Sequence, residues 1–228
     1  MIKLMPILLA VVIGLSMYMM SSWRLRRTLD QQSTRLADRR LEGLCAEMAE
    51  AVGIPELKVH VYEIDPINGL AAPDGRIFIT RGFLRKYHAG EVSAEEIASV
   101  IAHELGHVAL GHARRRMIDF SGQNAVRVIL AMILGRFIPF VGIYIADFLA
   151  RLLGTSLSRS DEYEADAYAA AVLTKAGIGT APQISLLQKL SRMVPTHGMP
   201  AWMMTHPKAE ARIAAIEKLS TGWQLPRA

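Results

Sequence analysis

Cysteine is almost absent from this chain of 228 residues, because Cys45 is the only one. A single thiol excludes a disulfide framework within the chain, and it excludes a zinc site built from paired cysteines. Internal repeats and low-complexity tracts are also missing. Hydrophobic residues reach 51%, so there is enough apolar surface for a packed core, and disorder is excluded as the main state. The length allows one domain of ordinary size with an appendage.

The excess of positive charge is also small, since the chain has 26 basic and 21 acidic residues. The basic residues gather around Arg26 and around Arg115. No RNA-binding signature and no basic stripe interleaved with aromatic residues accompanies them. We therefore expect no nucleic-acid partner, and we interpret the clusters as a membrane-flanking set and a solvated helix end.

The one long uncharged stretch lies at the start of the chain. Residues 5–20 carry no charge, and with Ser21, Ser22 and Trp23 the run approaches the ~20 residues that cross a bilayer. A cleaved signal peptide is the alternative, but its apolar core is usually ~7–15 residues. The run favours a retained single-pass anchor at residues 1–23. Arginines follow it more than they precede it, which predicts a cytoplasmic main domain, with an extracytoplasmic (periplasmic) one as the alternative.

Beyond the anchor, hydrophobic periodicity organises the chain into a linking segment, residues 24–54, and a globular domain, residues 55–228. The linking segment contains a predicted helix over residues 28–52. Alternation predicts a strand at 57–64, and Asp74-Gly75 predicts a hairpin turn ahead of a strand at 76–80. Further helices are expected from Ser93 to about Met117, across 126–153 as a hairpin on the core or at the membrane surface, from about Ser158 to Gly177, and at 182–193 and 207–219.

The strongest chemical signal lies inside the helix that begins at Ser93. Residues 103–107 read HELGH, an HExxH motif. Four residues advance a helix by ~400°, so His103 and His107 share a face, about 6 Å apart along the axis, and can hold one zinc ion. Glu104 is rotated by ~100°, near enough to reach a water at the metal. A coincidental pair of core histidines is the alternative, but unpaired imidazoles are costly in an apolar setting.

Two histidines leave zinc short of a protein ligand. The longer motif with a third histidine fails, because Leu110 and Ala113 stand where it needs glycine and histidine. His112 points ~140° away from His107 and is expected at the surface or in the second layer around the metal. The third ligand must therefore come from another part of the chain.

The segment SRSDEYEAD, residues 158–166, is the obvious source. Glu162 and Asp166 are four apart and share a helix face. Glu162 would complete a His₂Glu set that leaves the fourth zinc position to water. Asp166 would accept a hydrogen bond from the other ring nitrogen of a zinc histidine. The alternatives are a solvated acidic helix start and Glu164 as ligand, although Glu164 faces away from Asp166.

AHELGHVALGH together with SRSDEYEAD resembles the M48 family of zinc endopeptidases, the group of HtpX and the CAAX prenyl endopeptidases. AAPDGRIFITRGFL ahead of the zinc helix, and Thr205-His206-Pro207 with Arg212-Ile213 near the end, match further landmarks. The resemblance covers roughly residues 45–220. It implies a mainly α fold with a small β-sheet (α+β), gluzincin-like, with Glu162 as third ligand. The chain departs from multi-pass members, which carry two clear transmembrane helices between the zinc motifs.

The hypothesis that follows is a membrane-anchored zinc endopeptidase that cuts unfolded or misfolded polypeptides, with one Zn²⁺ per chain. Glu104 would be the general base. His206, in a proline-bounded loop, is the first candidate for oxyanion stabilisation; a fourth metal ligand or an ordinary helix-start histidine are alternatives. Arg212 would pair with Asp166 or the oxyanion, or be a plain surface arginine.

Extended substrate is expected to pair with a strand edge. The candidate contacts are Asn68, Ala71, Ala72, Ile77 and Ile79. The predicted partners are polypeptides and the lipid bilayer, and the sequence predicts no particular oligomeric state. A chaperone-like binding module with a structural or regulatory zinc is the rival hypothesis, and a peptidase for one lipidated or membrane substrate is another.

Overall fold

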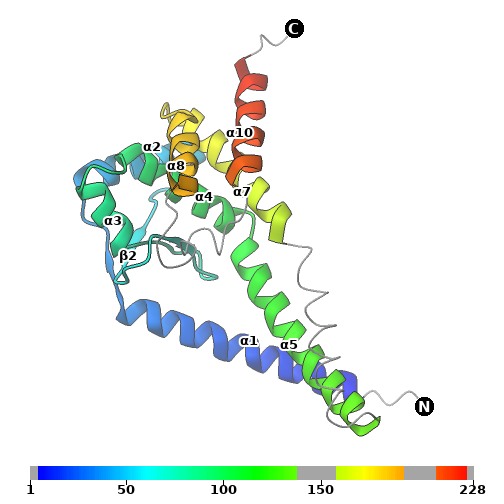
Figure 1. Cartoon of the computed structure of the whole chain (residues 1–228). Helices are drawn as coiled ribbons and strands as arrows, with labels where there is room; N and C mark the ends of the chain where they lie inside the picture. Colours follow the sequence, from blue (N-terminus) through cyan, green and yellow to red (C-terminus); the bar gives the residue numbers. More distant parts are fainter. Residues whose placement is uncertain (1–4, 138–157, 193–208, 225–228) are drawn as a thin grey trace. The chain divides into compact units, whose positions relative to one another are not determined.

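The computed structural model describes residues 5–137, 158–192 and 209–224 (Figure 1). The chain forms two compact units, residues 1–31 with 112–159, and residues 32–111 with 160–228. All the described candidate site residues lie in the second unit. His206 lies outside the described residues.

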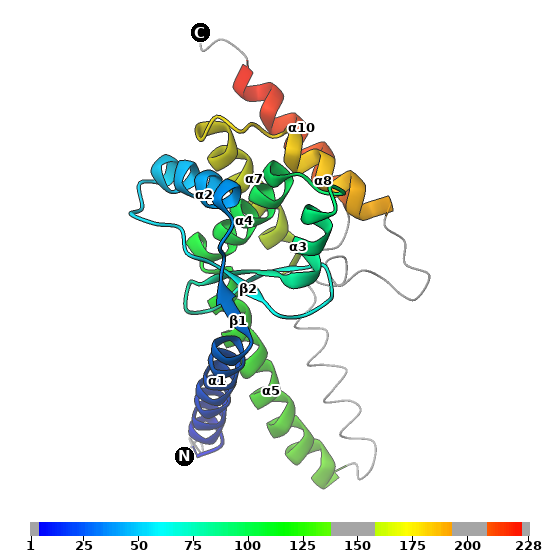
Figure 2. The same ribbon diagram turned by 90° about the vertical axis from the view of Figure 1, so that its left-hand side faces the viewer.

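The first unit contains two long helices, α1 (Met5–Gln31) and α5 (His112–Phe137). They lie side by side (Figures 1 and 2). A Cβ built on Gly14 would lie 3.6 Å from the Cβ of Ala125, which is an ordinary van der Waals contact between the two helices. In the described ranges, no helix combines the length and the apolar character needed to cross a membrane. The expected hairpin is described only as far as Phe137, and residues 138–153 lie outside the described part.

The prediction of one helix over residues 28–52 is wrong in its middle. Helix α1 continues to Gln31, strand β1 (Ser33–Arg35) follows, and a new helix α2 (Arg39–Val52) begins after it. Pairing with a distant strand overrides local helical periodicity here, because Thr34 lies opposite Val61 in the sheet. Asp38 then caps α2 by accepting a hydrogen bond from the amide of Leu41.

The second unit contains a four-stranded mixed sheet in the order β1-β2-β4-β3. Its other strands are β2 (Val59–Tyr62), β3 (Gly69–Ala71) and β4 (Ile77–Thr80). β2 and β4 run parallel, whereas β1 with β2 and β3 with β4 are antiparallel pairs. The predicted turn at Asp74-Gly75 joins β3 to β4, with Gly75 at φ +89°. β1 and β3 are consequently the edge strands.

The HExxH motif lies on α4 (Ala94–Ala109), which follows α3 (Arg81–His88). Ser93 and Glu96 form the expected capping box at its start. α4 ends at Ala109 with Leu110 as its C-cap, earlier than expected, because Gly111 takes a left-handed φ of +71°. His112 therefore belongs to the next helix.

Three further helices complete the described part of the second unit: α7 (Ser158–Lys175), α8 (Ala181–Arg192) and α10 (Ala209–Gln224). α4 is the central element, because α2, α8 and strands β3 and β4 all pack against it. Figure 2 shows it enclosed between these elements. Its buried apolar face meets the inner face of the sheet in the main core, which includes Val59, Val61, Ile77, Ile79, Phe83, Ile97, Ile101 and Leu173. The predicted mainly helical fold with a small sheet is confirmed.

Candidate metal centre

The two histidines of the motif stand one helical turn apart on α4 and face the same side. Their Nε2 atoms are 3.1 Å apart, and their rings meet edge to face with centroids separated by 4.7 Å. His103 is 2% exposed and His107 is 3% exposed. Two imidazole nitrogens are thus aimed at one point in the interior.

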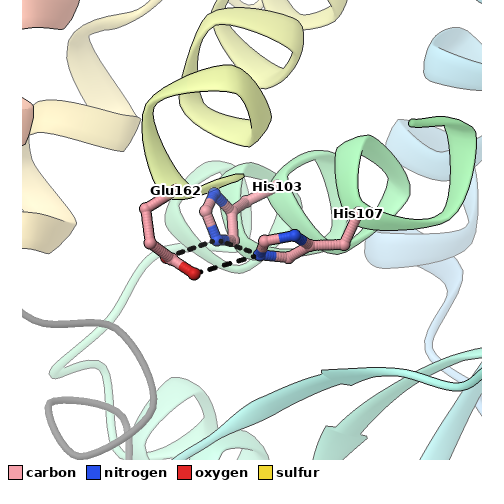
Figure 3. Close-up of side chains that lie close together, drawn as sticks. All are labelled: His103, His107 and Glu162. Carbon is pink, nitrogen blue, oxygen red and sulfur yellow. Dashed lines mark hydrogen bonds and ion pairs between the residues drawn. The ribbon is translucent and has the colours of Figure 1, made fainter. Parts of the chain in front are cut away.

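The third ligand comes from α7, as the sequence predicted. The carboxylate of Glu162 lies 3.5 Å from Nε2 of His103 through Oε2 and 3.5 Å from Nε2 of His107 through Oε1 (Figure 3). A tetrahedral metal with ligand bonds of ~2.1 Å has ligand atoms ~3.4 Å apart. The spacing of the three side chains therefore fits one small divalent cation, and all three are buried.

Close packing of α7 on α4 makes this convergence possible. Gly106 lies between the two histidines, and a Cβ built on it would be 3.0 Å from the carbonyl oxygen of Ala165. Ala165 in turn lies between Glu162 and Asp166 in the sequence. The two helices that carry the ligands therefore touch at Gly106, next to the metal ligands.

Asp166 supports the site from the same face of α7. Its Oδ1 lies 3.0 Å from Nδ1 of His103. An ionised carboxylate only accepts hydrogen bonds, so Nδ1 carries the proton and the lone pair of Nε2 points at the metal position. The neutral tautomer that a metal requires is thus set by the chain itself.

Arg212, from α10, closes this network. Its guanidinium donates to both oxygens of Asp166, over 2.6 Å from Nε and 2.8 Å from Nη2. Nη1 lies 3.6 Å from Oε2 of Glu162. Arg212 is only 2% exposed, so it is not a surface arginine.

The charges of these groups follow from their contacts. Burial would raise the pKa of Asp166, but hydrogen bonds from Arg212 and His103 hold it well below its usual range. Burial lowers the pKa of His103, yet the carboxylates of Asp166 and Glu162 outweigh burial and raise it to about 9. A proton and a metal ion therefore compete for the same imidazole.

Glu104 lies beside the ligands, between α4 and the edge strand β3. Its side chain is 2% exposed. It approaches the strand closely, because a Cβ built on Gly69 would be 2.9 Å from Oε1 of Glu104. The carboxylate thus packs against the face of β3 that α4 covers.

The predicted substrate contacts divide between the two strands. Ile77 and Ile79 belong to β4, whose main chain is paired with β2 on one side and β3 on the other. Their side chains are 1% and 0% exposed, inside the core. A peptide cannot pair with an inner strand, so these two residues are corrected to core positions. Asn68 and Ala71 lie on or beside the edge strand β3.

Three placements differ from, or add to, the sequence-based picture. Ala72 is 2% exposed, so only its main chain is near the edge. His112 is 0% exposed, which contradicts the surface position, one of the two alternatives expected for it. Gln183, which the sequence analysis did not single out, lies against Asp166. Its signal was a polar residue at the first position of the buried stripe 183, 186, 187 and 190 of α8.

Comparison with known proteins agrees with this geometry. The profile described as "Peptidase family M48" matches residues 35–220. The metalloprotease LoiP of Escherichia coli is 29% identical over 155 residues, 68% of this chain and 60% of LoiP. Human mitochondrial metalloendopeptidase OMA1 is 25% identical over 170 residues, 71% of this chain and 32% of OMA1.

A protease HtpX homolog of Acidiphilium cryptum is 30% identical over 182 residues, which is 72% of this chain and 61% of that protein. The matched segments therefore span less than two thirds of the length of these relatives.

Proposed function

Because the chain belongs to peptidase family M48, we propose that it is a zinc-dependent endopeptidase whose single Zn²⁺ is held by His103, His107 and Glu162. The observation that carries the proposal is the convergence of these three buried side chains at the spacing of a tetrahedral site. Two imidazoles and one carboxylate are the ligands of catalytic zinc sites that keep one position open. A closed structural site would need a fourth protein ligand.

Zinc in this position would polarise a scissile carbonyl and lower the pKa of a water molecule towards ~7. Glu104 would accept the proton of that water and pass it to the departing amine. Its position between α4 and β3 supports this role, because the carboxylate follows His103 on the zinc helix and lies against the strand proposed to hold the substrate. Asp166 and Arg212 would hold His103 in the required tautomer without touching the substrate.

The edge strand β3 is the proposed substrate platform. Thr80 donates its amide to the carbonyl of Asn68, and Ala72 donates to that of Arg76, so residues 68, 70 and 72 face β4. The peptide groups of Gly69 and Ala71 consequently point away from β4. The side chain of Asn68 accepts from the amide of Gly69, so Ala71 offers both its amide and its carbonyl to a substrate strand.

Main-chain pairing of this kind makes little demand on the substrate sequence. It needs an extended segment, which an unfolded or misfolded polypeptide presents and a folded one hides. We therefore propose unfolded or misfolded chains as the substrate class. Cleavage at a single site within a folded substrate would not fit a strand edge that contacts only the main chain of the substrate.

Attachment to a membrane through residues 1–23 is a further proposal. It is supported by the uncharged run at 5–20 and by the exposure of large apolar side chains on α1. These include Leu8, Val11, Leu15, Met19 and Trp23. The arginines that follow the run support a cytoplasmic main domain. Alkaline extraction of cell membranes tests the attachment, since a protein released with the soluble fraction contradicts it.

Replacing Glu104 by Gln tests the enzymatic proposal. The amide keeps the shape of the side chain but removes the base, so the rate of casein cleavage should fall by on the order of 10²–10⁴-fold. Zinc content, measured by metal analysis, should stay at the wild-type level. If Glu104→Gln still cleaves, Glu104 is not the base. If the zinc-loaded wild type cleaves nothing, the chain is a binding module and not a peptidase.

A further inference from the structure

Gln183 is a buried polar side chain that the proposed reaction does not use. It occupies the first position of the buried stripe of α8 and is 4% exposed. Burying an amide is unfavourable unless it forms hydrogen bonds. Its Nε2 lies 3.3 Å from the peptide oxygen of Asp166 and 3.3 Å from Oδ1 of the same residue. Both partners are acceptors, so the NH₂ end of the amide must face Asp166.

The carboxylate oxygen that Gln183 approaches is the one on which the metal site depends. Oδ1 of Asp166 lies 3.0 Å from Nδ1 of His103 and accepts from Nη2 of Arg212 over 2.8 Å. Donors from α4, α8 and α10 thus meet on one oxygen of a residue in α7. Arg212 fixes the plane of the carboxylate by its two-point contact.

Gln183 restrains a different part of the same residue. By contacting both the peptide oxygen and Oδ1 of Asp166, the amide links the main chain of α7 to the end of the side chain. That contact adds a restraint on rotation about χ1 of Asp166 that is referred to the main chain of α7 itself, whereas the contact with Arg212 depends on the position of α10. If Oδ1 moved, its hydrogen bond to His103 would lengthen. The imidazole ring would then be held less firmly with Nε2 towards the metal position.

We infer that Gln183 is a positioning residue of the metal site, acting through Asp166 and His103 on metal affinity. The inference rests on the metal site of the proposed function. It assigns α8 a part in that site, although α8 contributes no ligand. The amide affects the metal more than the stability of the fold, because its Oε1 has no hydrogen-bond partner within the described residues. Replacing the amide by an apolar side chain removes this unpaired oxygen, and Oδ1 of Asp166 keeps its contacts with His103 and Arg212, so the cost to folding should be small.

The test is Gln183→Met, which keeps the length of the side chain and removes the donor. Zinc affinity is measured by competition with a chromogenic chelator on the full-length protein. We expect a loss on the order of threefold to tenfold, below the 10–100-fold typical of residues that contact a metal ligand directly. The urea midpoint of the metal-free protein should stay at the wild-type value. Gln188→Met, the same change at an exposed position of α8, should leave both quantities unchanged.

Two results would overturn the inference. One is zinc affinity of Gln183→Met equal to that of Gln188→Met. The other is a fall in affinity that is matched by a fall in the urea midpoint, which would make the role of Gln183 purely structural. Cobalt(II) provides a spectroscopic readout, since a repositioned His103 changes the visible absorption of the bound ion.

Gln183→Leu is the second variant, in case the methionine protein does not fold. Its apolar side chain also lacks the donor, so zinc affinity should again fall. Wild-type affinity in this variant contradicts the need for a donor at position 183. The proposed function fails separately, through a zinc-loaded wild type that cleaves nothing.

Discussion

Arg212 and Asp166 form a buried two-point ion pair, in which Nε donates to Oδ2 over 2.6 Å and Nη2 donates to Oδ1 over 2.8 Å. The pair joins α10 to α7, and through Nδ1 of His103 it reaches α4. Both side chains are 2% exposed. Each charge is therefore stabilised mainly by the other charge and not by water.

Removing the cation should expose that dependence. Arg212→Met leaves the carboxylate of Asp166 buried without its main partner, and the free energy of unfolding of the metal-free protein should fall by about 3–5 kcal/mol. Arg212→Lys keeps the charge but not the planar two-point contact, and should cost less. Urea unfolding measures both. Arg192→Met, at an exposed position of α8, is the matched control, and equal effects at positions 192 and 212 would refute the prediction.

Glu162→Ala should abolish zinc-dependent stabilisation. A ligand bound only by the folded state at 100 times its dissociation constant contributes about 2.7 kcal/mol, so zinc should raise the melting temperature of the wild type. The alanine variant lacks the third ligand and should show no rise. Glu164→Ala is the control, since Glu164 is an exposed acid of the same helix that accepts a hydrogen bond from the hydroxyl of Ser160. If Glu164→Ala also loses the response, the ligand assignment is wrong.

Much of this site was predictable because its chemistry is local. Two histidines four residues apart must share a helix face, and so must Glu162 and Asp166, whatever the rest of the fold does. That the two faces meet is a tertiary fact. It depends on Gly106 and Ala165 touching, which no periodicity reveals.

The errors come from strand pairing, which is not local. β4 lies between β2 and β3 because β2 pairs in parallel with β4 and not with β3, the next strand in the sequence. Sequence alternation identified both strands but not their order, so Ile77 and Ile79 were expected at an edge. The helix over residues 28–52 failed for the same reason, since Thr34 is held extended by a partner in β2.

Gly106 should be intolerant of a branched side chain. The position of its absent Cβ is 3.0 Å from the carbonyl oxygen of Ala165 and 3.1 Å from its Cα. Gly106→Val adds two further methyl groups, which must push α7 away from α4 and separate Glu162 from the histidines. Zinc affinity should fall by at least tenfold. Gly43→Val is the control. Gly43 lies in α2, and a Cβ built on it has nothing within 4 Å. This variant undergoes the same change in helix propensity but should keep the zinc affinity of the wild type.

The pH dependence of stability should show the contribution of Glu96, a buried acid at the start of α4 and remote from the metal ligands. Burial would raise its pKa, but hydrogen bonds from Lys189, Ser185 and the amide of Ser93 lower it below the ordinary value. A carboxyl whose pKa is lower in the folded state stabilises the fold above its unfolded pKa of ~4.3. That contribution disappears as the pH falls through the folded pKa.

Glu96→Gln should therefore lower the free energy of unfolding by about 1.5–3 kcal/mol at pH 7, the usual size for hydrogen bonds to a charged group. The difference from the wild type should shrink as the pH falls below ~4 and vanish once the carboxyl is protonated in both states. Urea unfolding from pH 7 to pH 3 measures it. Glu217→Gln, at an exposed position of α10, is the control and should show no such trend. If the difference in unfolding free energy between Glu96→Gln and the wild type stays constant with pH, the charge of Glu96 does not stabilise the start of α4.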